Sequence, residues 1–330
     1  MADSKQYPFV TVIMPIRNEA PYIKSSLGAV LDQTYPRDRV EILVVDGVSN
    51  DNTLDYILEM PGADRVTIIS NPQRRQASAL NLAIPKAKGD IVVRIDGHTI
   101  IASDYLEECV KALVEITGAQ NVGGPMNPVG TTSVGKAIAA AGKSAFAVPT
   151  AFHVSDKAQF TDTVYLGAWW KSTLDQVGLF NETATANEDY EFNYRIRAAG
   201  GQIYLSPRIR SAYYGRQSFH DLWTQYFRYG IGKVEILRLF PKSLKFRHLV
   251  APVFLLVLIA GGITAPLHWL LLSLWVGVIA VYLAANLFFS FRVARRVEAS
   301  VWLWLPAVFF VIHVAWGAGF WFALLKRLVG

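Results

Sequence analysis

The sequence predicts an α/β protein, in which a doubly wound and mainly parallel sheet is followed by an interfacial amphipathic helix and a helical membrane region. Residues 10–100 alternate apolar, β-branched runs with helical patterns, and such alternation is typical of a parallel sheet covered by helices. From Leu249 onward the chain is apolar and carries five basic residues and one acidic residue, which is typical of membrane-spanning helices.

The expected elements of the sheet follow in a regular order. Strands are predicted at the runs VTVIM, EILVV, VTIIS and IVVRI. Between them we expect helices over residues 21–33, after Asp51 and around Leu80. Beyond the fourth strand, Ser103 is expected to begin a further helix that Gly118 ends.

Polar residues follow three of these strands at the points where the strands end. They are Pro15, Arg17 and Glu19 after the first strand, Asp46 after the second, and Asp96 with His98 after the fourth. In open parallel sheets, ligands bind beyond the carboxyl ends of the strands. We therefore expect these residues to line one binding edge.

Asp96 and His98 lie two residues apart in the stretch VVRIDGHT. If the strand continues through Gly97, both side chains point to the same side and could hold one divalent cation. The alternative is a polar turn after a buried strand, and this stretch alone favours the turn.

Asp46 precedes the turn-forming run GVSNDNT. Its carboxylate could accept a hydrogen bond from a nucleobase imide. It could equally serve the turn itself, and the residues support both interpretations to the same degree.

Asn187, Glu188 and Asp189 open a predicted helix that ends at Gly200. An N-cap followed by acidic residues is ordinary helix electrostatics. The same helix field lowers a carboxylate pKa, and a general base must be ionised at neutral pH. The two interpretations are therefore compatible.

Residues 218–240 are predicted to form one helix that mixes aromatic and basic side chains, as helices in a membrane interface do. Gln225 and Arg228 are three residues apart and share one face, with Tyr229 beside them. Arg228 could bind a departing diphosphate or a lipid phosphate, and the helix alone favours lipid.

The pair Trp169 and Trp170 could stack on a sugar ring or a lipid, although aromatic pairs are usually core residues. The six histidines show no paired metal-binding spacing. A Walker loop, a GxGxxG fingerprint and a nucleophile elbow are also missing from the sequence.

Membrane-spanning helices are expected at residues 249–265, 267–290 and 301–325, since one crossing needs about 20 apolar residues. With the preceding part of the chain inside, the arginines of the second loop also fall inside, as the positive-inside rule expects. Lys326 and Arg327 would then lie outside, against that rule, unless the last segment is re-entrant. An outside C-terminus is slightly favoured.

Charge is distributed unevenly along the chain. Residues 1–199 contain 18 basic and 23 acidic side chains, whereas residues 200–248 contain 9 basic and 2 acidic ones. This basic block adjoins the membrane region, so we expect it to meet lipid headgroups or a phosphorylated substrate and not nucleic acid. Cys109 is the single cysteine, and together with the lack of a signal-peptide pattern this predicts a cytoplasmic location for the soluble part.

Five motifs in order carry a family resemblance. They are VTVIMPIRNEAPYI, ILVVDGVSNDNT, ASALNLAIPKAKGDIVVRIDGH, GLFNETATANEDYEFNYRIRAAGG and QYFRYG. In this order they resemble the family 2 glycosyltransferases, which have the GT-A fold. The Asp-Gly-His ending, the QYFRYG segment and the C-terminal membrane anchor look most like the succinoglycan chain-elongating glucosyltransferase subgroup.

The resemblance implies a role for each motif. Asp46 would bind the uracil of a UDP-sugar, Asp96 would bind Mg²⁺ or Mn²⁺ on the diphosphate, and Asp189 would be the base on the acceptor hydroxyl. Glu188, Gln225, Arg228 and Tyr229 would meet the acceptor and the diphosphate. Beside these implied roles, we expect His98 as a second metal ligand and Pro15, Arg17, Glu19, Asn81 and Trp170 as further substrate-binding residues. The implied domains are a cytoplasmic GT-A domain (1–215), an interfacial helix region (216–248) and a transmembrane region of about three helices (249–330).

The chain departs from the family pattern in three places. Gly47 stands where a second Asp is common, His98 where the metal motif normally repeats Asp, and Tyr229 where Trp is frequent. The second departure bears on metal affinity, and the third bears on stacking against the acceptor.

The resemblance thus implies an inverting, metal-dependent transfer of a hexose, by subgroup glucose, from a UDP-sugar to a polyprenyl-diphosphate-linked saccharide in exopolysaccharide biosynthesis. The expected place is the bacterial inner membrane, with membrane lipids and other polysaccharide-assembly proteins as partners. The alternatives are a polyprenyl-phosphate glycosyltransferase, a processive polysaccharide synthase, and an inactive sugar-nucleotide sensor or complex subunit. Asp46, Asp96 and Asp189 favour an active enzyme. The QYFRY segment favours the processive class, whereas three or fewer spans argue against a polymer channel unless the protein forms oligomers.

Overall fold

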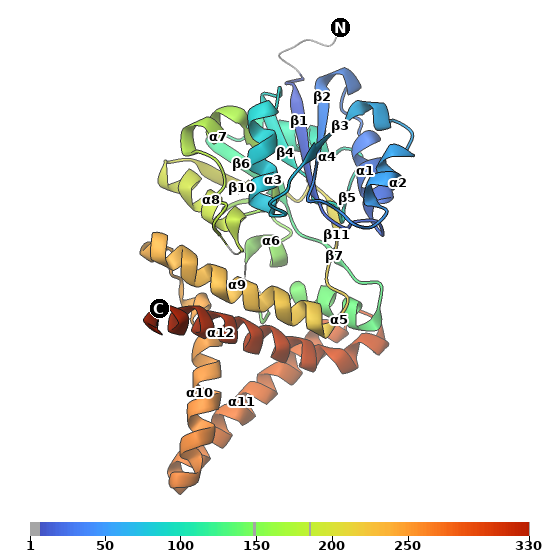
Figure 1. Cartoon of the computed structure of the whole chain (residues 1–330). Coiled ribbons are helices and arrows are strands. Elements are labelled where there is room, and N and C mark those ends of the chain that lie inside the picture. The colour runs from blue at the N-terminus through green and yellow to red at the C-terminus, as the bar shows by residue number, and fades with distance from the viewer. Residues whose placement is uncertain (1–6, 148–149, 185, 330) are drawn as a thin grey trace. The chain divides into compact units, whose positions relative to one another are not determined.

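The structure is a computed structural model that describes residues 7–147, 150–184 and 186–329 (Figure 1). The chain forms two compact units. The sheet unit comprises Met1–Asn127, Val154–Thr183 and Glu188–Tyr214, and the helical unit comprises Pro128–His153, Ala184–Asn187 and Gly215–Gly330.

The sheet unit is organised around eight strands in the order β3-β2-β1-β4-β9-β6-β10-β8. Their bounds are β1 Val10–Ile16, β2 Val40–Asp46, β3 Val66–Ser70, β4 Ile91–Arg94, β6 Ala119–Gly124, β8 Gln159–Thr161, β9 Tyr165–Trp170 and β10 Gln202–Leu205. The first four strands pair in parallel, as do β6 and β10. β9 runs antiparallel to both β4 and β6, and β8 is antiparallel to β10. The predicted doubly wound and mainly parallel sheet is confirmed.

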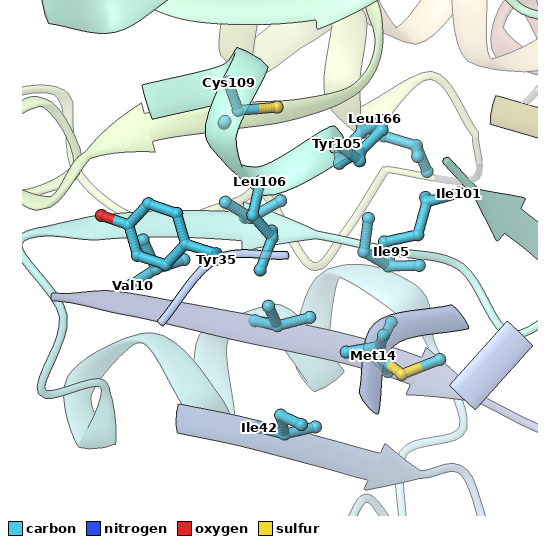
Figure 2. Packing of buried hydrophobic residues seen from close by; sticks show 14 of the residues in the cluster. Val10, Met14, Tyr35, Ile42, Ile95, Ile101, Tyr105, Leu106, Cys109 and Leu166 are labelled. Atoms are coloured by element: carbon cyan, nitrogen blue, oxygen red, sulfur yellow. The ribbon is translucent and has the colours of Figure 1, made fainter. Parts of the chain in front are cut away.

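Helices cover both faces of this sheet. They are α1 Ile23–Leu31, α2 Thr53–Leu58, α3 Gln76–Ala83, α4 Tyr105–Glu115, α7 Lys171–Val177 and α8 Glu188–Ala198, with the 3-10 turns η1 Arg37–Arg39, η2 Ala63–Arg65 and η3 Ile84–Lys86. Alternate residues of β1, Val10 and Met14 among them, are buried against α1 and α4 in one core (Figure 2). Helix α3 packs on β1 and β2.

Two predicted helix boundaries are corrected by the structure. The helix predicted from Ser103 begins at Tyr105, with Asp104 at the N-cap position. The Ser103 carbonyl instead accepts a hydrogen bond from the Thr34 amide at 2.9 Å, which keeps this residue in the preceding turn. The helix predicted over residues 21–33 is the shorter Ile23–Leu31.

The helical unit contains the long helices of the chain. They are α5 Ser133–Gly142, α9 Phe219–Leu239, α10 Val250–Thr264, α11 Trp269–Ala294 and α12 Leu305–Val329. Its shorter elements are β7 Pro128–Val129, η4 Pro241–Ser243, η5 Phe246–His248, η6 Ala265–Leu267 and η7 Ala299–Trp304, and a short helix, α6 Ala151–Val154, ends at the boundary of the unit. The helix predicted over residues 218–240 is confirmed, and the Ser218 hydroxyl caps it by accepting from the Asp221 amide at 3.2 Å.

Three helical segments of the described chain are long and apolar enough to cross a membrane. They are Phe246–Leu267, Trp269–Ala294 and Ser300–Arg327. Their positions confirm the three predicted apolar helices, and helices of this composition are typical of membrane-associated proteins.

Candidate active site

The carboxyl ends of three neighbouring strands lie at one edge of the sheet. Ile16 at the end of β1 pairs with Asp46 at the end of β2, and Arg94 at the end of β4 pairs with Ile13 of β1. The predicted polar segments that follow these strands therefore start from the same edge, where open α/β sheets bind ligands.

The first two of these segments are tied together by hydrogen bonds. The Asn18 amide donates to the Ser49 hydroxyl at 2.9 Å, and the Asn18 side-chain carbonyl accepts from the Asn50 amide at 3.0 Å. Pro15 is buried within β1, and the exposed Arg17 lies against Gly47. These contacts shape a polar rim at the strand ends.

Asp46 is buried and takes part in the turn that follows it. Its Oδ1 accepts from the Ser49 hydroxyl at 2.6 Å, and its Oδ2 accepts from the Ser49 amide at 3.1 Å. Each carboxylate oxygen can accept a further hydrogen bond. The carboxylate can thus hold the turn and still meet a ligand donor.

Asp96 is held by the neighbouring side chain of Arg94. Arg94 Nε donates to Asp96 Oδ1 at 2.8 Å, and Nη2 donates to Oδ2 at 3.1 Å. Gln76, the first residue of α3, donates to Oδ1 at 2.9 Å. Burial favours the neutral acid, but the charge and hydrogen bonds of Arg94 outweigh it and lower the pKa of Asp96.

The same guanidinium faces the predicted acidic helix. Arg94 Nη1 lies 3.7 Å from Glu188 Oε1 at the start of α8. Burial raises the pKa of Glu188 to about 6, the negative charge of Asp189 adds to this rise, and Arg94 opposes it. Burial also raises the pKa of Asp189, again against Arg94. The carboxylates of Asp96, Glu188 and Asp189 therefore all interact with one buried positive charge, the guanidinium of Arg94.

Helix α8 is anchored to the sheet below these acids. Asn193 accepts from the Asn121 side chain of β6 at 2.6 Å and donates to the Thr163 hydroxyl at 2.8 Å. Arg195 pairs with Glu191 and donates to the carbonyls of Val177 and Leu179. These bonds fix the helix that carries Glu188 and Asp189.

His98 and Asp96 take different partners. β4 ends at Arg94 and the next strand, β5 (Thr99–Ile101), pairs with β11 (Ser211–Tyr214), so the strand does not continue through Gly97. His98 Nδ1 lies 2.8 Å from Glu19 Oε1. A Cβ at Gly97 would lie 2.7 Å from Glu19 Cγ, so only glycine leaves room for this pair.

The surroundings of Asp96 fit a cation that takes most of its ligands from a nucleotide. Within the described residues, no three His, Cys, Asp or Glu side chains are grouped to hold a metal ion. Asp96 Oδ2 accepts one hydrogen bond and keeps a lone pair for a ligand. Mg²⁺ is commonly held by one or two carboxylates together with substrate phosphates and water, which matches this donor set.

Two other predicted residues of the sheet unit have their own partners in the fold. Trp170 pairs with Ile91 at the start of β4, which is the opposite end of the strand from Asp96. Trp169 is buried against Phe180 and Phe192, so this half of the pair is a core residue. Asn81 is engaged in the fold, because its amide exchanges two hydrogen bonds with the Phe180 backbone, both at 2.9 Å.

The remaining predicted residues lie on α9 in the helical unit. Gln225 donates to the Tyr229 hydroxyl at 3.0 Å, which confirms that these side chains share a face. Asn187 donates to the Tyr229 backbone carbonyl at 3.2 Å. Arg228 is exposed.

Sequence reasoning missed Arg94 and Gln76. Arg94 had a readable signal, because it is a basic residue inside a β-branched strand and stands two positions before Asp96. A charge in such a run needs a buried partner. Gln76 carried no comparable signal, because its contact depends on where α3 begins.

Comparison with known proteins identifies the family. The profile of "Glycosyl transferase family 2" matches residues 11–135, and that of "Glycosyl transferase family group 2" matches residues 91–325. A Methanococcus voltae protein, named dolichyl N-acetyl-alpha-D-glucosaminyl phosphate 3-beta-D-2,3-diacetamido-2,3-dideoxy-beta-D-glucuronosyltransferase, is 27% identical over 96% of this chain and 98% of its own length. The succinoglycan biosynthesis protein ExoA of Rhizobium meliloti (strain 1021) is 28% identical over 95% of this chain and 94% of its own length.

Among solved structures, the Pyrobaculum calidifontis mannosyltransferase PcManGT, determined with GDP-Man and Mn²⁺, is similar with a TM-score of 0.59. It is 21% identical, and the match covers 93% of this chain and 86% of that one. This likeness confirms the GT-A fold, and the ExoA match confirms the expected resemblance to the succinoglycan enzymes. The chain belongs to the family 2 glycosyltransferases.

Proposed function

We propose that this glycosyltransferase inverts configuration at the anomeric carbon as it moves a hexose from a UDP-sugar to a polyprenyl-linked saccharide. The observation that carries the proposal is the buried Arg94, which binds Asp96 and faces Glu188 beside Asp189. A cation-binding carboxylate and a candidate base thus meet at one edge of the sheet. Glucose is the first donor to test, because ExoA is a succinoglycan biosynthesis protein.

The donor would bind across the strand ends. The open acceptor positions of Asp46 suit the imide N–H of uracil, and Pro15, Arg17 and Glu19 lie on the polar rim beside it. Asp96, with His98 as a second ligand in the proposed arrangement, would hold Mg²⁺ or Mn²⁺, and this cation would neutralise the charge of the departing diphosphate. Replacing His98 by Asp tests the ligand, since a direct imidazole contact favours Mn²⁺ over Mg²⁺.

Asp189 is proposed as the base for transfer. The acceptor hydroxyl attacks the anomeric carbon, the bond from that carbon to the diphosphate oxygen breaks, and the hydroxyl proton passes to Asp189. Glu188 would orient the acceptor. Gln225, Arg228 and Tyr229 are proposed to meet the acceptor and the diphosphate, since Arg228 is exposed and can form charge-assisted bonds.

The proposed setting is the cytoplasmic side of a bacterial inner membrane. The apolar helices and the basic block of residues 200–248 support an enzyme whose acceptor is carried by lipid. The Methanococcus voltae relative is named for a lipid-linked sugar phosphate, so a polyprenyl monophosphate carrier is a second candidate beside the diphosphate. Other polysaccharide-assembly proteins are proposed as partners on the strength of the ExoA match.

Radiolabelled UDP-hexoses and synthetic acceptors test this function. Purified protein in lipid should place label in an organic-soluble product with Mg²⁺ or Mn²⁺, and acceptors with a monophosphate or a diphosphate carrier will separate the two candidates. A long insoluble polymer would instead indicate a processive synthase. UDP binding without turnover on any donor would indicate a sensor.

The base assignment has its own test. Asp189→Asn should lower transfer by about 10²- to 10⁴-fold, while calorimetry shows that UDP still binds. The exposed Asp175 on α7 provides a matched control, and Asp175→Asn should keep normal activity. Full turnover by Asp189→Asn would contradict the assignment.

A further inference from the structure

Helices α9 and α12 lie side by side in the helical unit (Figure 1). Near the beginning of α12, the Trp304 ring lies 6.0 Å from the Phe219 ring of α9. Near its end, the Phe322 ring lies 5.5 Å from the Phe227 ring. Phe219 and Phe227 are eight residues apart, which is about 12 Å along a helix. Both ends of α12 therefore reach the same short stretch of α9.

The two helices also approach closely at Phe227 and just beyond it on α9. A Cβ at Gly319 would lie 2.0 Å from the Phe227 carbonyl oxygen, and a Cβ at Gly230 would lie 2.3 Å from the Trp316 carbonyl oxygen. Such separations require glycine on both helices. The backbones of α9 and α12 are thus in direct contact and occupy the same layer.

Helix α9 cannot lie within the hydrocarbon of a bilayer. Its exposed side chains include His220, Asp221, Arg228 and Arg238, and charged groups facing lipid tails are strongly unfavourable. They are compatible with the headgroup region, where mixed aromatic and basic helices reside. Since α12 contacts α9 at both of its ends, α12 must lie at the same level and cannot reach the opposite leaflet.

The side chains of α12 fit this position. Val308, Phe309 and Ile312 are buried in a core shared with Leu222 of α9 and with α5. Phe310, Phe322 and Leu325 of α12 are about half exposed, and the Phe322 ring also contacts Phe227 of α9. A helix that lies at the boundary between headgroups and acyl chains needs one face packed on protein and apolar side chains exposed to the acyl chains.

Helices α10 and α11 differ from α12 in both charge and packing. Between residues 250 and 291 the chain carries no Asp, Glu, Lys or Arg. The two helices pack together, with Trp275 donating to the Leu258 carbonyl at 3.2 Å. α12 meets α10 near the start of α10, where Trp321 donates to the Pro252 carbonyl at 2.8 Å. From there α10 runs away from α12 toward the turn that leads into α11 (Figure 1).

Helices α10 and α11 form a helical hairpin. Cationic residues cluster before α10, at the end of α11 and at the end of α12. They are Lys242, Lys245 and Arg247 before α10, Arg292, Arg295 and Arg296 at the end of α11, and Lys326 and Arg327 at the end of α12. The turn between α10 and α11 has none. Basic residues favour the cytoplasmic face and anionic lipid headgroups, so all three groups belong to one surface.

We infer that only α10 and α11 cross the bilayer, while α9 and α12 lie together in the headgroup interface on the side where α10 begins and α11 returns. The partner of this α9–α12 surface is anionic lipid. The described part of the chain therefore crosses the membrane twice, and α12 ends on the same side as the segment that leads into α9. This arrangement removes the conflict of Lys326 and Arg327 with the positive-inside rule.

Cysteine labelling in membrane vesicles of known orientation tests the inference. Cys109 is the single cysteine and is buried, so it contributes little background to an impermeant maleimide. Lys326→Cys should label from the same side as Lys242→Cys, and His268→Cys from the opposite side. Lys326→Cys labelling together with His268→Cys would show that α12 crosses. Labelling of all three from one side would show that the hairpin does not cross.

Depth measurements provide a second readout with other variants. Phe310 and Phe322 are twelve residues apart, about 18 Å along the helix. Spin labels at Phe310→Cys and Phe322→Cys should report equal, shallow depths. A label at Ile259→Cys of α10, which is 56% exposed, should be deeper than both. Depths of Phe310→Cys and Phe322→Cys that differ by most of that length would overturn the in-plane position.

Discussion

Arg94 forms a two-bond contact with Asp96, at 2.8 and 3.1 Å, and the same guanidinium lies 3.7 Å from Glu188. A single strand residue therefore links the proposed cation ligand to the proposed acceptor-binding helix. All of these groups are largely buried. Removing the arginine from such a group leaves buried carboxylates without a counter-charge, which is far more damaging than losing a surface pair.

We expect Arg94→Met to abolish most transfer and to lower the melting temperature. The destabilisation should be about 3 kcal/mol, the magnitude for breaking a buried ion pair. Thermal unfolding in detergent and steady-state assays would measure both. Arg210→Met is the control, because the Arg210–Asp104 pair at 2.9 Å is well exposed and such pairs contribute about 0–1 kcal/mol. Equal losses in both variants would argue against a special role for Arg94.

The raised pKa values of Glu188 and Asp189 predict opposite effects of acid on activity and stability. Transfer needs the proposed base Asp189 in its ionised form, and burial raises the pKa of Asp189, so activity should fall as the pH is lowered from neutral. A carboxyl whose pKa is raised by folding binds its proton more tightly in the native state, so protonation stabilises the fold. Glu188→Gln should melt higher than the wild type at pH 7.5, and the gap should shrink at pH 5.5. A gap that widens in acid would contradict the raised pKa of Glu188.

Gly97→Ala should impair the site without unfolding the sheet. The added methyl would lie 2.7 Å from Glu19 Cγ, so Glu19 must move and His98 loses its 2.8 Å contact. A displacement of this size costs about tenfold to a hundredfold in transfer. Gly28→Ala in α1 is the matched control, because its nearest neighbour, Met60 Cε, lies at 3.8 Å. Unchanged transfer by Gly97→Ala would show that the Glu19–His98 contact is dispensable.

Gly319→Leu should separate α9 from α12. The Leu side chain would collide with the Phe227 backbone, so we expect a lower melting temperature and reduced transfer by the protein in lipid. Gly277 in α11 has nothing within 4 Å of an added Cβ, and Gly277→Leu should behave like the wild type. If the two leucine variants are equally stable, the close approach is not needed.

The sheet and the long helices could be predicted because each rests on a local repeating pattern. β1 and β2 were visible as β-branched runs, and α9 was visible as one helix that mixes aromatic and basic side chains. The edge that gathers Asp46 and Asp96 followed from parallel pairing alone. What could not be predicted were contacts that depend on register and backbone direction.

The ending of β4 illustrates this limit. Side-chain alternation placed Asp96 and His98 on one side only if the strand continued, but the backbone leaves the ladder after Arg94. Arg94 then reaches Asp96, and His98 turns to Glu19. Trp170 shows the same limit: its distance from the strand ends follows from the antiparallel direction of β9, which no sequence pattern revealed.

The anchoring of α8 has a consequence for motion during the catalytic cycle. The side-chain amide of Asn193 accepts one hydrogen bond from Asn121 and donates another to Thr163. Arg195 donates to the Leu179 carbonyl in the turn that follows α7. A helix restrained by several buried hydrogen bonds has a high local opening free energy. Helix α8 therefore remains in place during the catalytic cycle. Any movement that admits or releases a substrate must come from other segments.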